Sequence, residues 1–429
     1  MMRAMLVTVL FVIAVPSQAM SSRAMRAFGG DLEALRRQLA VTSVSAAIVD
    51  HGGIAWSRDY GAAGPDTQYP IASITKSLAS VALMQLVEQG RLSIDQPVED
   101  PGAAPKTTIV NYLSHTSDGP YFLYSSERYA RLGPIIERAA GMSFAELLQK
   151  NIFKRAGMRD SVLSAAEARH MVALSEPYTT RLSPAAGVIA TARDLALFDA
   201  ALDRGDLIST AGRERLFTPQ TRADGTPLPY ALGFFAEVVG GERVVWGYGQ
   251  ERTNSALYLK LPDRHLTLIV LATGNAFSDP FWLLFGEVRR SPLVLAFLHH
   301  AGVRTMPDDR TVVQAMALAA TKEKAESNAL LHRVLDKAID PSQADGALLA
   351  TLARCGDAAL RAKGEQIAAM LLARDPDHPR LLFDLAVLRE QDGRPGDARP
   401  LFARLASQTN LSSTTIVKIS AEHAASAIP

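Results

Sequence analysis

The segment spanning residues 74–89 constrains the fold more than any other, because apolar residues occupy most faces of the helix that it predicts. A helix with so little polar surface has to be buried inside the protein. Gly90 follows the segment and fits the end of a helix. The helix starts directly after Ser73 and contains one lysine, Lys76. The sequence therefore predicts a buried helix with a hydroxyl at its start and a cation inside.

Segments with a period of two lie on both sides of a helical block. Residues 43–62 predict two strands joined at Asp50-His51-Gly52-Gly53, and residues 107–200 predict helices. Beyond Pro227 the period returns to two, with predicted strands at 231–239, 242–246, 255–261 and 266–273. We expect the early and late strands to pair in one antiparallel sheet, with the helical block inserted between them.

The chain beyond about residue 300 is rich in Ala, Leu and Arg and is predicted to be helical throughout. One window, 379–410, has small and apolar residues at the offsets of a tetratricopeptide unit: Leu382, Leu385, Ala386, Gly393, Ala398, Phe402 and Leu405. Stacked repeats normally need three or more units, so a plain helical cap on the first domain is an equally good interpretation. Such an array could also bind a protein partner.

The N-terminus predicts an export signal. Arg3 precedes an apolar run from Leu6 to Val15, and Ser17-Gln18-Ala19 provides a cleavage site after Ala19. The run has about half of the roughly 20 residues that a membrane-spanning helix needs, which disfavours an uncleaved anchor. We expect a signal peptide at 1–19, a first domain at 20–300 and a helical region at 301–429, in a periplasmic or secreted protein.

Composition excludes several classes of function. The chain has 429 residues, with 45 Lys and Arg against 44 Asp and Glu, and a net charge of +1 gives no electrostatic case for nucleic acid. Cys355 is the single cysteine, so an intrachain disulfide and a Cys-based metal site are excluded. The nine histidines lack metal-binding spacing and no Gly-rich phosphate loop occurs, so we expect no cofactor and no metal.

Ser73 and Lys76 form the pattern most indicative of chemistry. Their i, i+3 spacing puts the hydroxyl and the amine on one face of the helix. A free lysine titrates near 10.4, and a base at pH 7 needs a pKa about three units lower. Burial and the positive end of a helix both disfavour the ammonium form. The alternative is a buried salt bridge, with Ser73 as a simple helix cap.

In this context the chain resembles the class C β-lactamase and penicillin-binding-protein superfamily of serine hydrolases. The resemblance covers about residues 40–300 and is carried, in the order of the family, by YPIASITKSLASVALMQLVEQGRLSIDQPV, TTIVNYLSHTSDG, YSSERYARLGPIIERAAGMSFAELLQKNIFKRAGMRDS, PAAGVIATARDLALFDAAL and VVWGYGQERTNSALYLKLPDRHLTLIVLATG. It implies an α/β (α+β) fold, with an antiparallel sheet flanked by helices and an inserted helical subdomain. It also implies an acyl-enzyme formed on the serine.

The family motifs transfer to individual residues of this chain. Ser73 matches the nucleophile, Lys76 its partner, and Tyr124 the tyrosine of the Tyr-x-Asn motif, which forms a coupled acid–base pair with the lysine. Ser126 replaces the asparagine of that motif and can still donate one hydrogen bond to a substrate carbonyl. His115 is interpreted as a hydrogen-bonded structural histidine, because no second ligand or partner is visible.

The third motif departs from the family pattern. It reads Gly247-Tyr248-Gly249 here, so the usual Lys or His is missing. The resemblance implies that Tyr248 and Gly249 border the substrate and that the N–H of Gln250 stabilises the oxyanion together with the N–H of Ser73. The alternative is a simple strand start.

Two functions remain open at this stage. The first is an exported serine hydrolase acting on a small-molecule or peptide ester or amide, such as an esterase, a D-amino-acid peptidase or a β-lactamase-like enzyme, with a cell-wall-related substrate among the candidates. The second is a non-catalytic penicillin-binding-like or scaffolding protein, whose C-terminal helices bind a partner. Retained Ser73, Lys76 and Tyr124 favour the enzyme, whereas the altered Gly247 favours the binder.

Overall fold

The computed structural model describes residues 19–98, 100, 103, 105–117, 121–222, 225–278, 286–320, 323–337 and 346–407. The predicted export signal falls almost entirely on residues 1–18, which lie outside this set. In the described ranges, no helix combines the length and the apolar character needed to cross a bilayer.

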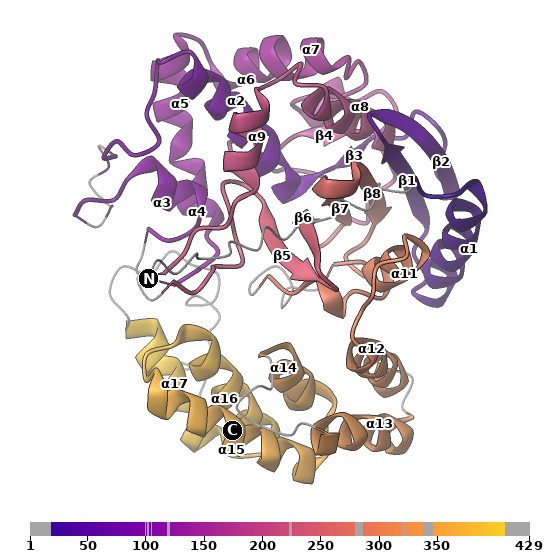
Figure 1. Ribbon diagram of the computed structural model, residues 1–429, viewed down its shortest axis with the longest axis vertical. Coiled ribbons are helices and arrows are strands. Elements are labelled where there is room, and N and C mark those ends of the chain that lie inside the picture. Colours follow the sequence, from indigo (N-terminus) through magenta and orange to yellow (C-terminus); the bar gives the residue numbers. More distant parts are fainter. Residues whose placement is uncertain are drawn as a thin grey trace, which may run out of the picture.

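A six-stranded antiparallel sheet forms the centre of the first domain (Figure 1). Its order is β2-β1-β8-β7-β6-β5, with bounds β1 Ser43–Asp50, β2 Gly53–Gly61, β5 Phe235–Val239, β6 Glu242–Gln250, β7 Asn254–Leu261 and β8 Leu266–Thr273. The early strand β1 pairs directly with the late strand β8, where Val44 lies opposite Ala272. The predicted antiparallel sheet with an inserted helical block is thus confirmed.

Helices cover both faces of this sheet. One face packs against α1 (Ser22–Gln38) and α11 (Pro292–His300), where Phe28 and Phe297 meet. The other face packs against α2 (Thr75–Glu88) and α8 (Ala192–Asp203). Because side chains alternate between the two faces of a strand, five of the six strands contribute to both cores, whereas the edge strand β2 contributes only to the core beneath α1 and α11.

The inserted block consists mainly of short helices that extend the α2 core. They are α3 Ile109–Leu113, α4 Ser126–Ala130, α5 Leu132–Ala140, α6 Phe144–Leu147, α7 Lys154–Ala156 and α9 Thr210–Phe217, with the π-helical turn η2 Leu148–Phe153 and the 3-10 turn η3 Ala165–Glu167. A two-stranded ribbon, β3 (Tyr69–Pro70) with β4 (Ile189–Ala190), links its two ends. Ser143 and Glu146 form a reciprocal capping box at the start of α6, which satisfies two backbone N–H groups.

The central helix α2 is buried along nearly its whole length, as its apolar sequence predicts. Every residue from Thr75 to Leu86 is buried, and Gly90 follows with a positive φ of 68°. Ser73 itself lies one step earlier, in the 3-10 turn η1 (Ala72–Ile74) that leads into α2.

The late hairpin starts later than its sequence suggests. A strand from residue 231 is predicted, but β5 begins at Phe235. The chain bends at Gly233, where φ is 91° and a Cβ would lie 2.0 Å from the Ser80 hydroxyl oxygen. Residues 231–234 therefore pack as a turn against α2, which the period-two pattern does not reveal.

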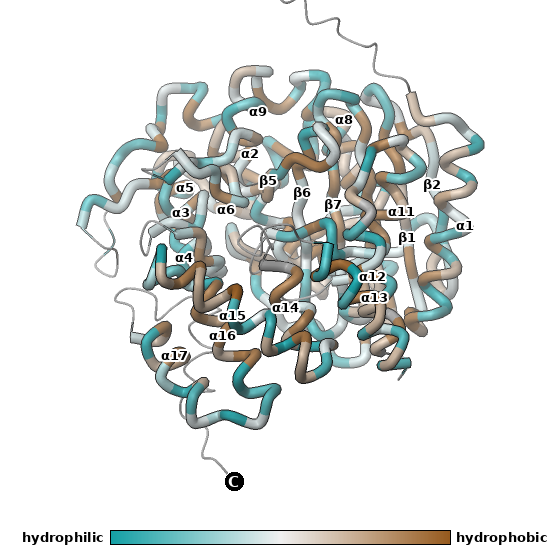
Figure 2. The backbone as a smooth tube through the Cα atoms, turned by 60° about the horizontal axis from the view of Figure 1, so that its bottom comes forward, coloured by the Kyte–Doolittle hydropathy of each residue, from teal (hydrophilic) through white to brown (hydrophobic). Residues whose placement is uncertain are grey.

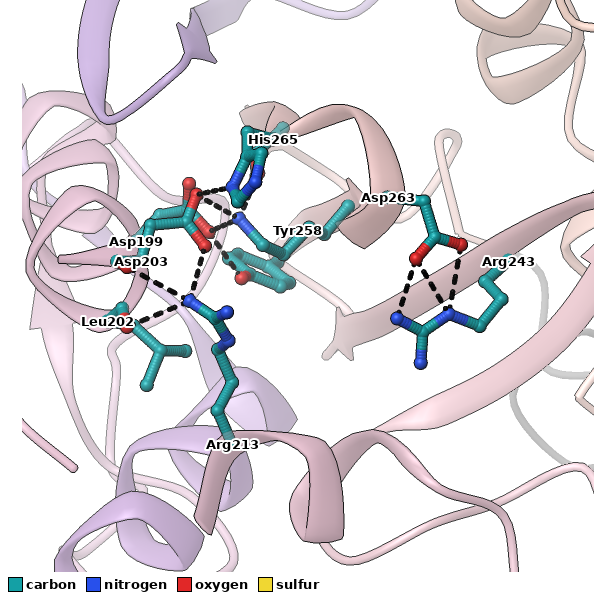
Figure 3. A network of polar contacts seen from close by, with 10 residues as sticks. Asp199, Leu202, Asp203, Arg213, Arg243, Tyr258, Asp263 and His265 are labelled. Atoms are coloured by element: carbon teal, nitrogen blue, oxygen red, sulfur yellow. Dashed lines mark hydrogen bonds and ion pairs between the residues drawn. The ribbon is translucent and has the colours of Figure 1, made fainter. Parts of the chain in front are cut away.

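A buried ionic network ties α8 to the sheet (Figure 3). The amine of Lys260 on β7 lies 3.0 Å from a carboxylate oxygen of Asp199 and 2.8 Å from one of Asp203. The Tyr258 hydroxyl donates a 2.5 Å hydrogen bond to Asp199, and Arg213 pairs with Asp203 at 3.2 Å. Lys260 and Asp199 are fully buried, and the Lys260 amine also donates a 3.1 Å hydrogen bond to the Thr267 hydroxyl, so protein groups take the place of water around these charges.

The C-terminal region forms a separate helical layer below the ends of β5 and β6 (Figure 1). Its helices are α12 Pro307–Ala320, α13 Lys324–Lys337, α14 Gly346–Cys355, α15 Ala358–Arg374, α16 Pro379–Gln391 and α17 Pro395–Ser407. Both hydrophobic and hydrophilic stretches occur along α15 (Figure 2), and its buried residues Leu360, Gly364 and Ile367 lie on one face, whereas every residue of α16 from Pro379 to Ala386 is buried.

The window with tetratricopeptide spacing forms the hairpin of α16 and α17. Its apolar positions are all buried: Leu382, Leu385, Ala386, Ala398, Phe402 and Leu405. Gly393 adopts φ 70° between the two helices, as the turn requires. The helical hairpin is thus present, while its assignment to the tetratricopeptide class stays a prediction.

Candidate active site

Ser73 lies at a strained turn between β3 and α2. The residue before it, Ala72, has φ 43°, a left-handed conformation that residues other than glycine rarely adopt. Such strain persists only where the surrounding structure enforces it, and it is common at functional sites. Ser73 is half-buried, whereas both of its neighbours are buried.

Lys76 is the centre of a compact polar cluster. Its amine donates hydrogen bonds of 3.0 Å to the Ser73 hydroxyl, 3.1 Å to the Ser126 hydroxyl and 3.0 Å to the carbonyl of Ala185. The side chain is 1% exposed, and this burial lowers the pKa of Lys76 from 10.5 to about 7. The predicted contact and the predicted direction of the pKa shift are both present.

The salt-bridge alternative for Lys76 does not hold within the described residues, where this amine makes no ion pair and all three partners are uncharged oxygens. An amine without a counter-ion in a buried site is readily neutral. Lys76 can therefore accept the proton of Ser73 near neutral pH.

Tyr124 covers the same cluster. Its side chain is 3% exposed, and the Lys76 amine lies 4.9 Å from the centre of its ring. Burial raises the pKa of Tyr124 well above 10, and interactions with the hydroxyls of Ser73 and Ser126 oppose this rise. In the Lys76–Tyr124 pair the proton therefore resides on the phenol, which leaves the amine as the base. Ser126 is exposed, so the cluster opens to solvent on this side.

His115 fixes the segment that carries Tyr124. Its Nδ1 accepts a 3.1 Å hydrogen bond from the backbone N–H of Ser125, and its carbonyl accepts one of 2.9 Å from that of Leu123. Its ring lies 4.3 Å from the Tyr124 ring. Burial and the positive charge of Lys76 keep the pKa of His115 well below 6.5, so the imidazole is neutral. The structural role expected for this histidine is confirmed.

The third-motif glycines lie on β6 against the turn that holds Ser73. A Cβ on Gly249 would lie 2.2 Å from the carbonyl oxygen of Ile71, so only glycine allows this approach. A Cβ on Gly247 would make ordinary contacts, 3.6 Å from the Ser77 hydroxyl oxygen. Position 247 therefore has room for a Cβ, so its glycine is not required by packing. Position 249 has no such room, and its glycine is required.

The backbone of Gln250 faces the open edge of β6. Glu251 donates its N–H to the carbonyl of Asn254 at 3.0 Å, and hydrogen-bonded pairs alternate in an antiparallel ladder. Gln250, paired with Ser255, therefore points its N–H away from β7. Strand β5 pairs only with Glu242–Trp246, so this donor lies beyond the end of β5. That orientation is the one required of an oxyanion donor.

The side chains of Tyr248 and Arg252 are placed differently from a substrate-binding group. Tyr248 is 2% exposed, and its ring packs edge-on against Trp246 at 5.4 Å, so the expected substrate contact can come only from its backbone. Arg252 is 83% exposed and pairs with Glu176 at 2.5 Å. Neither residue replaces the missing cation of the third motif.

Two contributors to the cluster are not predicted from the sequence. The carbonyl of Ala185 and the ring of Tyr129, 5.5 Å from the Lys76 amine, complete the surroundings of the base. Ala185 lies at the start of PAAGVIATARDLALFDAAL, a segment that carries the family resemblance but to which the resemblance assigns no site residue. In the described residues, no three His, Cys, Asp or Glu side chains gather closely enough to hold a metal ion.

Comparison with known families agrees with this geometry. The beta-lactamase family model matches residues 28–282, which is more than half of the chain. The chain belongs to the beta-lactamase family. A D-aminopeptidase of Brucella canis is 26% identical over 265 residues, covering 49% of this chain and 51% of the relative. The chain thus spans about half the length of the curated relatives it matches.

Two solved structures share the fold of this beta-lactamase family member. The octameric penicillin-binding protein homologue from Pyrococcus abyssi aligns with a TM-score of 0.57 at 19% identity, covering 67% of this chain and 81% of that one. The D-amino acid amidase from Ochrobactrum anthropi SV3, in complex with D-phenylalanine, aligns with a TM-score of 0.54 at 18% identity, covering 66% and 100%. These likenesses confirm the predicted fold class.

Proposed function

We propose that this protein is a serine hydrolase that acts through an acyl-enzyme on Ser73. The observation that carries the proposal is the 3.0 Å contact between the Ser73 hydroxyl and the buried amine of Lys76, which has no counter-ion among the described residues. A nucleophilic serine needs an adjacent base, and this pair supplies one.

The reaction begins when the Ser73 oxygen attacks the substrate carbonyl and its proton moves to the amine of Lys76. The N–H groups of Ser73 and Gln250 would stabilise the oxyanion, and one such donor is worth about a hundred- to a thousandfold in rate. As the carbon–leaving-group bond breaks, a proton passes to the leaving group through the Lys76–Tyr124 pair. Water then hydrolyses the acyl-enzyme, and the serine regains its proton.

The substrate we propose is an ester or amide that needs no carboxylate for binding. Gly247 lacks the cation that the third motif would place near such a carboxylate, and the exposed Arg252 is paired elsewhere. Relatives named D-aminopeptidase and D-amino acid amidase favour an amide of a D-amino acid within this class. A penicillin-like acid is correspondingly disfavoured.

We also propose that the enzyme acts outside the cytoplasm. This rests on the N-terminal sequence, with Arg3, the apolar run Leu6 to Val15 and the small residues before Met20. N-terminal sequencing of the protein from a periplasmic extract should find a start at Met20. A chain that keeps Met1 and stays with the cytoplasmic fraction would contradict this proposal.

The test of the activity is covalent labelling with a fluorophosphonate probe, followed by mass spectrometry of the labelled peptide. We expect the label on Ser73, no label in Ser73→Ala, and faster hydrolysis of D-alanine p-nitroanilide and aryl acetates than of a chromogenic cephalosporin. A folded protein that neither labels nor cleaves any of these would instead favour the scaffolding function.

A further inference from the structure

We infer that the C-terminal hairpin α16–α17 is a positioning element of the active site, which holds Tyr124 in place through its neighbours in the chain. This inference rests on the proposed function, and it assigns the C-terminal helices an intramolecular role. The juxtaposition that carries it is between the segment 121–124 and a hairpin that lies more than 250 residues later.

The first contact is apolar. Leu123, which directly precedes Tyr124, is 4% exposed and lies in the core of the hairpin rather than in either core of the sheet domain. Its cluster consists of hairpin side chains: Phe383, Ala386, Ala398, Phe402 and Leu405. The burial of Leu123 therefore depends on the hairpin being docked.

The second contact is polar. The Tyr121 hydroxyl donates a 2.7 Å hydrogen bond to Asp375, the C-cap residue that follows α15. Arg222 lies 4.7 Å above the Tyr121 ring and 3.5 Å from the same carboxylate, and the ring of His378 lies 5.4 Å from that of Tyr121. A third link joins Arg380 of α16 to Glu287 at 2.8 Å. The contacts of Tyr121 hold the start of α16 against the segment that leads to Tyr124, and the ion pair of Arg380 anchors α16 to the first domain.

Tyr124 is thus fixed from two directions. On its inner side, His115 binds the backbone of both Leu123 and Ser125. On its outer side, the hairpin holds the side chains of Leu123 and Tyr121. A displacement of about 1 Å in a reacting group can lower a rate a hundredfold, so a loose outer side would impair a phenol that must reach Ser73 and Lys76.

The experiment compares Leu123→Ala with Leu349→Ala in the full-length chain. Leu349 lies on α14, is fully buried and belongs to the other cluster of the C-terminal region, which contains no residue of 121–124. Both variants remove the same atoms from a helical core, but only Leu123→Ala loosens the Tyr124 segment. Leu123→Met serves as the conservative variant that refills the site.

We expect Leu123→Ala to lower the rate of Ser73 labelling by at least tenfold per folded molecule, Leu349→Ala to change it by less than twofold, and Leu123→Met to restore it to within about threefold. The pH midpoint of labelling should also rise in Leu123→Ala. The ionisable groups around the Lys76 amine are Tyr124, Tyr129 and His115, and displacing Tyr124 admits water to the amine.

Each outcome separates this inference from the proposed function. Wild-type protein that labels on Ser73 while Leu123→Ala labels equally fast with the same pH midpoint would overturn the inference alone. An equal loss of labelling rate in Leu349→Ala would mean that the effect comes from general destabilisation of the C-terminal region, and this result would also overturn the inference. Wild-type protein that never labels would refute the proposed function, and the inference would fall with it.

Discussion

The carbonyl oxygen of Ile71 lies against Gly249 so closely that a Cβ at this position would be 2.2 Å from it. This contact brings β6 next to the turn that carries Ser73, two residues after Ile71. It also fixes the position of the backbone N–H of Gln250, the next residue on β6, relative to the Ser73 hydroxyl. The glycine of the third motif therefore controls how closely the two proposed oxyanion donors approach each other.

We predict that Gly249→Ala lowers the rate of Ser73 acylation by about a hundred- to a thousandfold, the loss expected for one misplaced oxyanion donor. Gly247→Ala is the matched control, because it adds the same methyl group on the same strand with an ordinary 3.6 Å contact. Labelling rates of the two variants check this prediction. Equal rates in both variants would show that the close approach is unimportant.

Gly247 also tests the proposed substrate class. We predict that Gly247→His raises activity on carboxylate-bearing substrates by about tenfold and leaves aryl acetates unaffected, because it restores a cation near the substrate carboxylate. The Cβ has room at this position. Values of kcat/KM on matched substrates with and without a carboxylate would measure the effect, and no selective gain would place this strand away from the substrate.

The sequence was sufficient for the elements whose causes are local. The i, i+3 spacing of Ser73 and Lys76 predicted their contact, and the apolar segment 74–89 predicted a buried helix. Period-two segments predicted that the early and late strands share one antiparallel sheet, and the structure shows that they meet at β1 and β8, more than 200 residues apart.

The sequence did not predict contacts between distant segments whose residues show no periodic pattern. Leu123 and Phe402 are ordinary apolar residues, and nothing in their spacing indicates that they share a cluster. The bend at Gly233 depends on Ser80 from another element, and Ala185 contributes only a backbone carbonyl, which carries no side-chain signal. These features come from tertiary packing rather than from local preference.

The low pKa of Lys76 predicts the pH dependence of the reaction. The neutral amine is the active form, so kcat/KM should rise with pH through about 7 and level off above 8. Lys76→Ala should lower acylation by at least a thousandfold while the protein stays folded. Rate–pH profiles and circular dichroism test both statements, and near-normal labelling in Lys76→Ala would exclude this amine as the base.

The same lysine should destabilise the folded protein at low pH. The folded pKa of about 7 lies below the unfolded value near 10.5, so between these values the unfolded chain binds more protons and stability rises with pH. The total effect is on the order of 4 kcal/mol. Lys76→Met should therefore raise Tm more at pH 6 than at pH 9. Lys363→Met removes a half-exposed lysine and should show no such trend.

The network around Lys260 makes a prediction about stability that is independent of catalysis. Lys260→Met leaves the fully buried Asp199 without its cation, and breaking a buried pair in this way costs about 3–5 kcal/mol. We expect a fall in Tm on the order of 10 °C, measured by calorimetry. Lys363→Met is again the control, since its partner Asp336 is 60% exposed and such pairs contribute less than about 1 kcal/mol. An unchanged Tm in Lys260→Met would mean that Tyr258 and Arg213 alone satisfy the carboxylates of α8. Loss of Ser73 labelling at a temperature where the variant is folded would show that the network also supports the active site.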